Sequence, residues 1–186
     1  MGEGTSTAST THTRNVAGIS GKKYSINGGA GFAFSTMKLE GSTSSENYTA
    51  IQVFGRFGIN KDPFEFGPIL SWRTAKIGSV NSDSSTLGGF FDYNMPNAAS
   101  STMIFGPSAS YEIISGSVLL ITAAGTTSSS YSGNQIKLGG FIKWFPYMFP
   151  FCIRTDIYYQ IGKDNYSSST SQTGGLAATV GASLYF

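Results

Sequence analysis

The last twelve residues of the chain, 175–186 (GLAATVGASLYF), decide the fold because they alternate between two kinds of side chain. Successive side chains of a β-strand point to opposite faces of the sheet. The even positions hold the apolar side chains of Leu176, Ala178, Val180, Ala182, Leu184 and Phe186. The odd positions hold Ala177, Thr179, Gly181, Ser183 and Tyr185. The segment therefore predicts a strand with one continuous apolar face.

Seven further segments alternate in the same way, which predicts an all-β protein of eight strands. These segments lie near residues 23–36, 50–59, 64–75, 86–95, 102–113, 135–145 and 151–162. The connections alternate in length as well. Three are short and turn-like, at 60–63, 96–101 and 146–150. Four are longer and rich in Ser, Thr, Gly and Asn, at 37–49, 76–85, 114–134 and 163–174.

Alternating short and long connections place all the turns at one end of an antiparallel up-and-down barrel and all the long loops at the other. An even number of strands puts both termini at the turn end. Two features complicate the strand assignment. Pro68 and Pro107 interrupt predicted strands and suggest bulges or bends. The apolar stretch from Ser117 to Ala124 allows three interpretations: it extends the fifth strand, the register predicted for that strand is wrong, or the barrel has ten strands.

Charge placement predicts which face meets lipid. The apolar set contains no Asp, Glu, Lys or Arg in any of the eight segments. The opposite set carries Arg56, Glu65, Arg73, Asp92, Glu112, Lys137, Lys143, Arg154 and Asp156. A soluble barrel would turn its apolar face inward, but an eight-stranded barrel has barely enough room for side chains and would be overcrowded by the aromatic rings of this set. A Lys or Arg facing lipid at mid-membrane costs about 2–4 kcal/mol, so we predict a transmembrane β-barrel with these charges inside.

Composition narrows the possible partners and cofactors. Charged residues make up 12% of the 186 residues, and the net charge of +2 is too small to indicate nucleic acid. The single cysteine, Cys152, excludes an internal disulfide and a thiol metal cluster, and we expect it to face inward. We predict no metal and no cofactor. Residues 1–21 form a flexible polar tail and residues 22–186 the barrel. No signal peptide is visible, so we expect that a natural one has been removed and that Met1 is an expression start.

The C-terminus carries the most specific motif. Thr179, Gly181, Leu184 and Phe186 resemble the terminal-strand signal of bacterial outer-membrane proteins. Residues 140–146 and 154–159 are similar to the penultimate hairpin of the small OmpA/OmpX/OmpW-like barrels, and the pattern over 22–186 resembles that superfamily as a whole. The resemblance implies location in the outer membrane of a Gram-negative bacterium, and recognition of the last strand by the barrel assembly machinery. Trp72, Tyr93, Trp144 and Tyr159 are expected to lie at the lipid interfaces.

Three functional hypotheses follow. The inward charges form either a polar conduit or, as we favour, an ion-pair network in which Arg56, Arg73, Lys137 and Arg154 pair with Glu65, Asp92, Glu112 and Asp156. A lipid-modifying enzyme is disfavoured because the only histidine, His12, lies in the tail. The long loops, with Tyr48, Tyr131 and Tyr166, serve surface recognition or are simply solvated. We predict a monomer with a structural or adhesion-like role and no catalysis; the alternative is a narrow channel for small or hydrophobic solutes.

Overall fold

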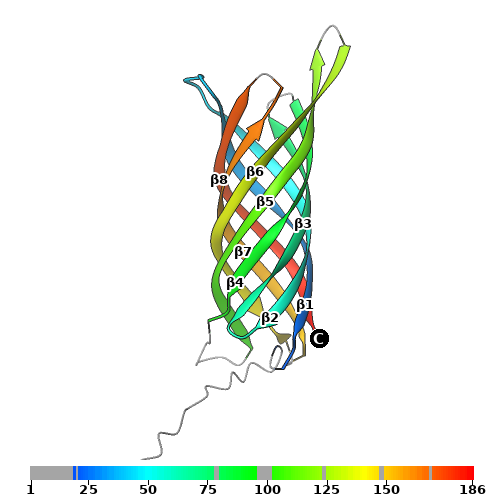
Figure 1. Cartoon of the computed structure of the whole chain (residues 1–186), viewed down its shortest axis with the longest axis vertical. Coiled ribbons are helices and arrows are strands. Elements are labelled where there is room, and N and C mark those ends of the chain that lie inside the picture. The colour runs from blue at the N-terminus through cyan, green and yellow to red at the C-terminus, as the bar shows by residue number, and fades with distance from the viewer. Residues whose placement is uncertain are drawn as a thin grey trace, which may run out of the picture.

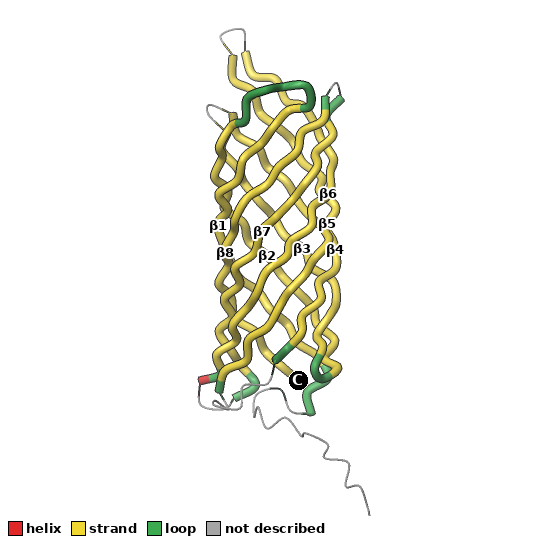
Figure 2. The backbone as a smooth tube through the Cα atoms, turned by 90° about the vertical axis from the view of Figure 1, so that its left-hand side faces the viewer, coloured by secondary structure: helices red, strands yellow, loops and turns green. Residues whose placement is uncertain are grey.

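Eight antiparallel strands close into one barrel in the computed structural model, which describes residues 19, 21–77, 80–95, 102–122, 125–146, 149–167 and 169–186 (Figures 1 and 2). This confirms the predicted all-β, up-and-down architecture. The strands are β1 (Tyr24–Leu39), β2 (Glu46–Lys61), β3 (Phe64–Ile77), β4 (Val80–Tyr93), β5 (Met103–Thr122), β6 (Gly125–Trp144), β7 (Phe151–Asn165) and β8 (Thr170–Tyr185). No helix within these described ranges is long and apolar enough to cross a bilayer.

The sheet closes because β1 pairs with both β2 and β8. Phe32 lies between Ile51 of β2 and Ala178 of β8. The C-terminus lies at the end of the barrel where β2 turns into β3, and the long β5–β6 hairpin projects from the opposite end (Figure 1). We call these the turn end and the hairpin end. The three connections predicted to be short do meet at the turn end, but the predicted difference in length is absent. The intervals between strands at the hairpin end, 40–45, 78–79, 123–124 and 166–169, are no longer than those at the turn end, 62–63, 94–102 and 145–150.

The strands at the hairpin end are longer than predicted. The connection predicted at 114–134 is mostly β-structure, because β5 and β6 stay in one register from Met103 opposite Trp144 to Thr122 opposite Gly125. The anomalous stretch that begins at Ser117 therefore extends β5, and there are eight strands rather than ten. The long loops predicted at 37–49, 76–85 and 163–174 are likewise mostly strand. Ser and Thr are compatible with strands whose outer face meets water, so a polar composition did not mean a loop.

The two strand prolines do not shift the register. Pro68 lies opposite Gly89 of β4, and Pro107 lies opposite Gly140 of β6. Between β2 and β3 the ladder skips Phe57 and Gly58 and then resumes in the same register, with Ile59 opposite Phe66. No residue is inserted at either proline, so the expected bulges are absent. The β2–β3 and β4–β5 ladders are instead interrupted beside Pro68 and Pro107, because a proline has no N–H to donate.

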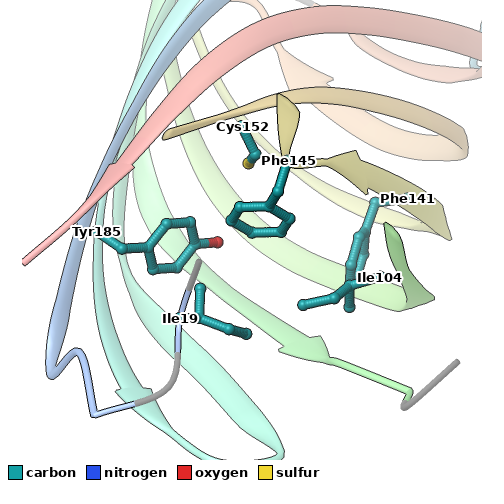
Figure 3. Close-up of a cluster of buried hydrophobic side chains, with 6 residues drawn as sticks. All are labelled: Ile19, Ile104, Phe141, Phe145, Cys152 and Tyr185. Atoms are coloured by element: carbon teal, nitrogen blue, oxygen red, sulfur yellow. The ribbon is translucent and has the colours of Figure 1, made fainter. Parts of the chain in front are cut away.

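An apolar cluster fills the interior at the turn end. Its members are Ile19, Ile104, Phe141, Phe145, Cys152 and Tyr185, all buried (Figure 3). We call this cluster the plug. Cys152 is a free thiol here and points inward as expected. Ile104, Phe141 and Tyr185 lie on the face that the sequence assigned to polar residues. Ile19 falls in the predicted tail, of which residues 1–18 and 20 lie outside the described residues.

Candidate functional site

The barrel interior brings together the nine charged residues that the sequence placed on one face. Alternation along the strands turns each of them inward, and none is more than 8% exposed. Isolated buried charges are costly unless they are paired and hydrogen-bonded. The partners of each charge therefore determine whether the interior is a filled core or an open conduit.

Arg154 of β7 is the centre of the ion-pair cluster nearest the plug. Its guanidinium binds Asp92 of β4 across the lumen with both terminal nitrogens, and its Nε lies 3.0 Å from each carboxylate oxygen of Asp156. Arg56 adds a longer contact of 3.4 Å to Asp156, and Thr179 donates a hydrogen bond of 3.1 Å to the same carboxylate. The Arg154 guanidinium also lies 4.6 Å from the ring centre of Phe141. The Phe141 ring, the Arg154 guanidinium and the carboxylates of Asp92 and Asp156 thus pack together inside the barrel.

Lys143 of β6 forms a second ion pair across the lumen, at the same level as the Arg154–Asp92 pair. Its Nζ lies 2.6 Å from Glu65 of β3 and 2.8 Å from the side-chain oxygen of Asn94. Tyr185 from the plug donates a hydrogen bond of 3.0 Å to Glu65. Glu65 is 2% exposed and Lys143 is fully buried. The pair therefore connects the plug to the ion-pair cluster.

Glu112 of β5 is the central carboxylate of the next group of paired side chains towards the hairpin end. Lys137 lies 2.8 Å from Glu112, and Thr86 and Gln135 donate hydrogen bonds of 2.7 and 2.9 Å to the same carboxylate. The Lys137 ammonium also lies 5.2 Å from the ring centre of Tyr158. Every predicted interior acid thus has at least one cationic partner.

Arg73 departs from the predicted network. Among the described residues it makes no ion pair with a carboxylate, and its Nε has no hydrogen-bond partner. It lies towards the hairpin end, where the interior is polar but loosely paired. Within the described ranges, the buried side-chain atoms without a partner in this region are Tyr48 Oη, Arg73 Nε, Ser84 Oγ, Asp164 Oδ1 and Ser171 Oγ. The sequence missed Asp164 as an interior acid because it placed that residue in a loop.

The three tyrosines predicted on long loops are not free surface anchors. Tyr48 and Tyr131 lie on β2 and β6 and point into the barrel, where they are 5% and 6% exposed. Tyr131 is 3.0 Å from Ser82 Oγ, and its ring stacks on Tyr166 with 5.2 Å between centroids. Burial raises the pKa of Tyr166 to about 12, so this residue stays a neutral phenol at physiological pH. The prediction that Tyr48 and Tyr131 lie on exposed loops is therefore wrong, because extended pairing places both on strands with their side chains inward.

The described residues contain no group of three His, Cys, Asp or Glu side chains arranged to hold a metal. His12 lies outside the described residues. The interior carboxylates with a base beside them, Glu65, Asp92, Glu112 and Asp156, are held in ion pairs. This arrangement suits a rigid filler better than proton transfer to a substrate.

The outer face is an apolar band with a sharp upper edge. Towards the hairpin end, the continuous apolar rows of the outer face end at Phe34, Ile51, Trp72, Leu87, Ile113, Ile136, Ile161 and Leu176, each at least 46% exposed. The next outward residues along the same strands are Thr36, Thr49, Thr74, Ser85, Ser115, Asn134, Lys163 and Gly174. Leu119 lies beyond this edge on β5 and is 39% exposed. We call the region below this edge the lipid band, because so much exposed apolar surface needs lipid around it.

The predicted interface aromatics lie at both edges of the lipid band. Tyr93 and Trp144 end β4 and β6 at the turn end, where the Tyr93 ring lies 5.5 Å from Phe64. Trp72 stands at the upper edge, and Tyr159 lies one outward position below that edge on β7. The sequence did not single out Tyr24, whose ring contacts Phe57 and Phe186 to continue the lower girdle.

The four residues of the C-terminal motif have separate local environments. Thr179 is buried beside Asp156, and Gly181 packs against the backbone of Gly28 and Gly29. Leu184 and Phe186 point outward into the lipid band and are 50% and 49% exposed. The motif thus follows the two faces of one closing strand.

We predict that Arg154→Met destabilises the barrel by about 3–5 kcal/mol, because it leaves Asp92 and Asp156 buried without their main cation. The free energy of unfolding would be measured by urea titration in phosphatidylcholine vesicles. Lys61→Met, which removes an exposed cation at the end of β2, is the control and should change stability by less than about 0.5 kcal/mol. Equal effects would show that the interior pairs are not structural.

We predict that Ile157→Arg impairs insertion, whereas Asn165→Arg does not. Both residues lie on the outer face of β7, but Ile157 is 62% exposed in the middle of the lipid band and Asn165 lies above its edge. An arginine at mid-membrane costs about 2–4 kcal/mol, and one near the interface costs about 0–1 kcal/mol. Folding yield in vesicles would be scored by gel mobility of unheated samples. Similar yields for both variants would place the band elsewhere.

No protein-family profile matches the chain, and no curated protein matches it significantly. Solved structures do match. Neisserial surface protein A is 12% identical, with 88% of this chain and 97% of that chain covered and a TM-score of 0.56. The outer membrane protein OprG from Pseudomonas aeruginosa is 11% identical, with 91% and 98% covered and a TM-score of 0.49. Ail, the attachment invasion locus protein of Yersinia pestis, is 14% identical, with 86% and 98% covered and a TM-score of 0.46. At 12% identity, the likeness to Neisserial surface protein A shows that this chain shares the fold of a small eight-stranded barrel.

Proposed function

We propose that the protein is an integral barrel of the bacterial outer membrane that presents a rigid β-surface outside the cell for surface interaction. One observation carries the proposal: strand pairing continues beyond the upper edge of the lipid band. From Ile113 at that edge, β5 runs on to Thr122, still paired with β6. At about 3.4 Å per residue, this extension reaches roughly 30 Å along the strand.

The chemistry of this extension supports surface presentation. Its outward residues on β5 and β6 include Ser115, Ser117, Ser128, Ser130 and Ser132, all exposed. Such side chains do not partition into lipid, and they offer hydroxyl donors and acceptors to a partner. In the proposed orientation the turn end faces the periplasm, and the C-terminal motif Thr179, Gly181, Leu184 and Phe186 is offered to the assembly machinery. Attachment to surfaces is the role that best uses an ordered polar extension.

The filled interior argues against the channel alternative. The plug, the Arg154 crossing and the Glu112 layer follow one another along the lumen. Catalysis has no support from the paired carboxylates. We therefore infer a closed scaffold whose activity resides at the hairpin end.

Shortening the hairpin tests the proposal. In this variant, residues 117–130 are replaced by Asn-Gly, so that a tight turn joins the paired residues Gly116 and Tyr131. We expect the barrel to fold normally, shown by an unchanged shift in gel mobility on heating. Attachment of vesicles carrying the protein to a cultured cell layer should fall at least severalfold. Unchanged attachment by the correctly folded variant would exclude the hairpin as the interacting surface.

Conductance in planar bilayers separates the closed scaffold from the channel. We expect no stable single-channel openings for the natural sequence, because bonded side chains cross the lumen. A double variant, Arg154→Ala with Asp92→Ala, removes one crossing and is the positive control, since it should raise the frequency of openings. Stable openings of the natural protein would favour the narrow channel.

A further inference from the structure

Two lysines flank one strand on the outer face at the hairpin end. Lys38 of β1 and Lys163 of β7 both pair with Gln172 of β8, so the three side chains form one row across the sheet. All three are exposed. With neighbouring strands about 4.8 Å apart, the two lysine Cα atoms lie roughly 10 Å from each other. Both flexible side chains can therefore reach one small anion placed over Gln172.

A groove lies directly beneath this row. Its volume is about 550 Å³, and its lining includes Thr36, Lys38, Tyr159, Ile161, Lys163 and Gln172. Gly174 forms part of its floor, and a Cβ added to Gly174 would lie 3.1 Å from the Tyr159 hydroxyl. The missing side chain at Gly174 therefore keeps the groove open and leaves that hydroxyl accessible. We call this feature the lysine groove.

The charges of the lysine groove are not neutralised by the protein. Within the described ranges, neither Lys38 nor Lys163 forms an ion pair, and no carboxylate lines the groove. This contrasts with the interior, where Lys137 and Lys143 each bind a carboxylate within 3 Å. Two unpaired ammonium groups over a hydroxyl-bearing groove are complementary to a phosphate.

The position of the groove selects the source of that phosphate. Lys163 is the first outward residue of β7 above the edge of the lipid band, and Ile136 and Ile161 from the band line the lower part of the groove. Cationic side chains immediately outside the hydrocarbon region attract anionic lipid headgroups. A groove that is cationic above and apolar below matches a headgroup joined to acyl chains, whereas a free anion would leave the apolar part exposed.

We propose that the lysine groove binds the phosphate-bearing headgroup of a membrane lipid. Lys38 and Lys163 contact the phosphate, and Tyr159 donates a hydrogen bond to it. The acyl chains lie along Ile161 and Ile136. This site rests on the membrane placement proposed above and adds a lateral ligand to it, separate from the hairpin surface.

Native mass spectrometry of the detergent-solubilised barrel tests the site with phosphatidylglycerol as the probe. We expect at least one bound phosphatidylglycerol, and an apparent affinity about thirtyfold lower for the double variant Lys38→Gln with Lys163→Gln. The matched control, Lys23→Gln with Lys61→Gln, removes two exposed lysines at the turn end and should stay within about twofold of the natural sequence. Gly174→Val, which fills the floor without changing charge, should also weaken binding.

Three outcomes would overturn the proposal: equal losses in the two double variants, equal binding of phosphatidylcholine, or displacement of the lipid by an equal concentration of inorganic phosphate. The last would show an anion site without lipid preference. A heat-dependent shift in gel mobility of each variant verifies that it has folded. If the shift persists while the substitutions at Lys38 and Lys163 leave lipid binding unchanged, the proposed lipid site is rejected and the proposed membrane barrel is retained. If the natural sequence itself shows no shift, the proposed function fails.

Discussion

The pairing of β1 with β8 is the constraint on which the rest of this structure depends. An open sheet edge in lipid would leave a row of unpaired amide and carbonyl groups, each costing several kcal/mol. Pairing from Ser25 opposite Tyr185 to Leu39 opposite Ser171 removes both edges at once. Closure with only eight strands also fixes a narrow lumen. Every inward residue must therefore fit beside side chains from the opposite wall.

A narrow lumen explains why the interior charges cross between distant strands. Arg154 and Asp92 come from β7 and β4, and Lys143 and Glu65 come from β6 and β3. Such pairs are not inherently more stabilising than well-packed apolar residues. They do, however, define the register. A slip of one residue would turn the inward set towards lipid, and each lysine or arginine at mid-membrane would then cost about 2–4 kcal/mol. The charged interior thus selects one pairing among those that closure allows.

The alternation of side chains along the sequence predicted the barrel correctly because the inward and outward faces of its strands differ in polarity within the lipid band. Strand number, closure, the outward face and the inward position of residues such as Glu112 all follow from a period of two. The same signal fails above the band. There both faces of residues 114–134 are polar or mixed, so alternation disappears although pairing with the neighbouring strand continues. The sequence therefore places Tyr48, Tyr131 and Asp164 on loops, whereas pairing places all three on strands.

The pairing of partners could not be predicted, because it depends on which strands face one another across the lumen. Arg154 and Asp92 are 62 residues apart in the chain, and nothing local distinguishes Asp92 from Glu65 as the partner. Arg73 was predicted to form an ion pair that the structure does not contain among the described residues. Its position on the charged face predicted an ion pair with Glu65, Asp92, Glu112 or Asp156, but its neighbours are Tyr48, Tyr131 and Asp164, and no ion pair within 4 Å joins it to a carboxylate of the described residues. The plug was more accessible to prediction, since Ile104, Phe141 and Tyr185 are apolar residues on the inward face beside the short turns.

Strand pairing above the membrane has a thermodynamic consequence for recognition. Ordering one residue of a flexible loop costs roughly 1–2 kcal/mol of conformational entropy, and a disordered loop of 21 residues such as 114–134 would incur that loss on binding a partner. Here the register between β5 and β6 has already ordered residues 114–122 and 125–134 during folding, so a partner meets a surface that needs little further ordering. Lipid held in the lysine groove would also reduce the freedom that a partner must remove, because it would fix the depth of β7, β8 and β1 in the bilayer. The height at which the hairpin stands above the membrane would then be set by the barrel itself.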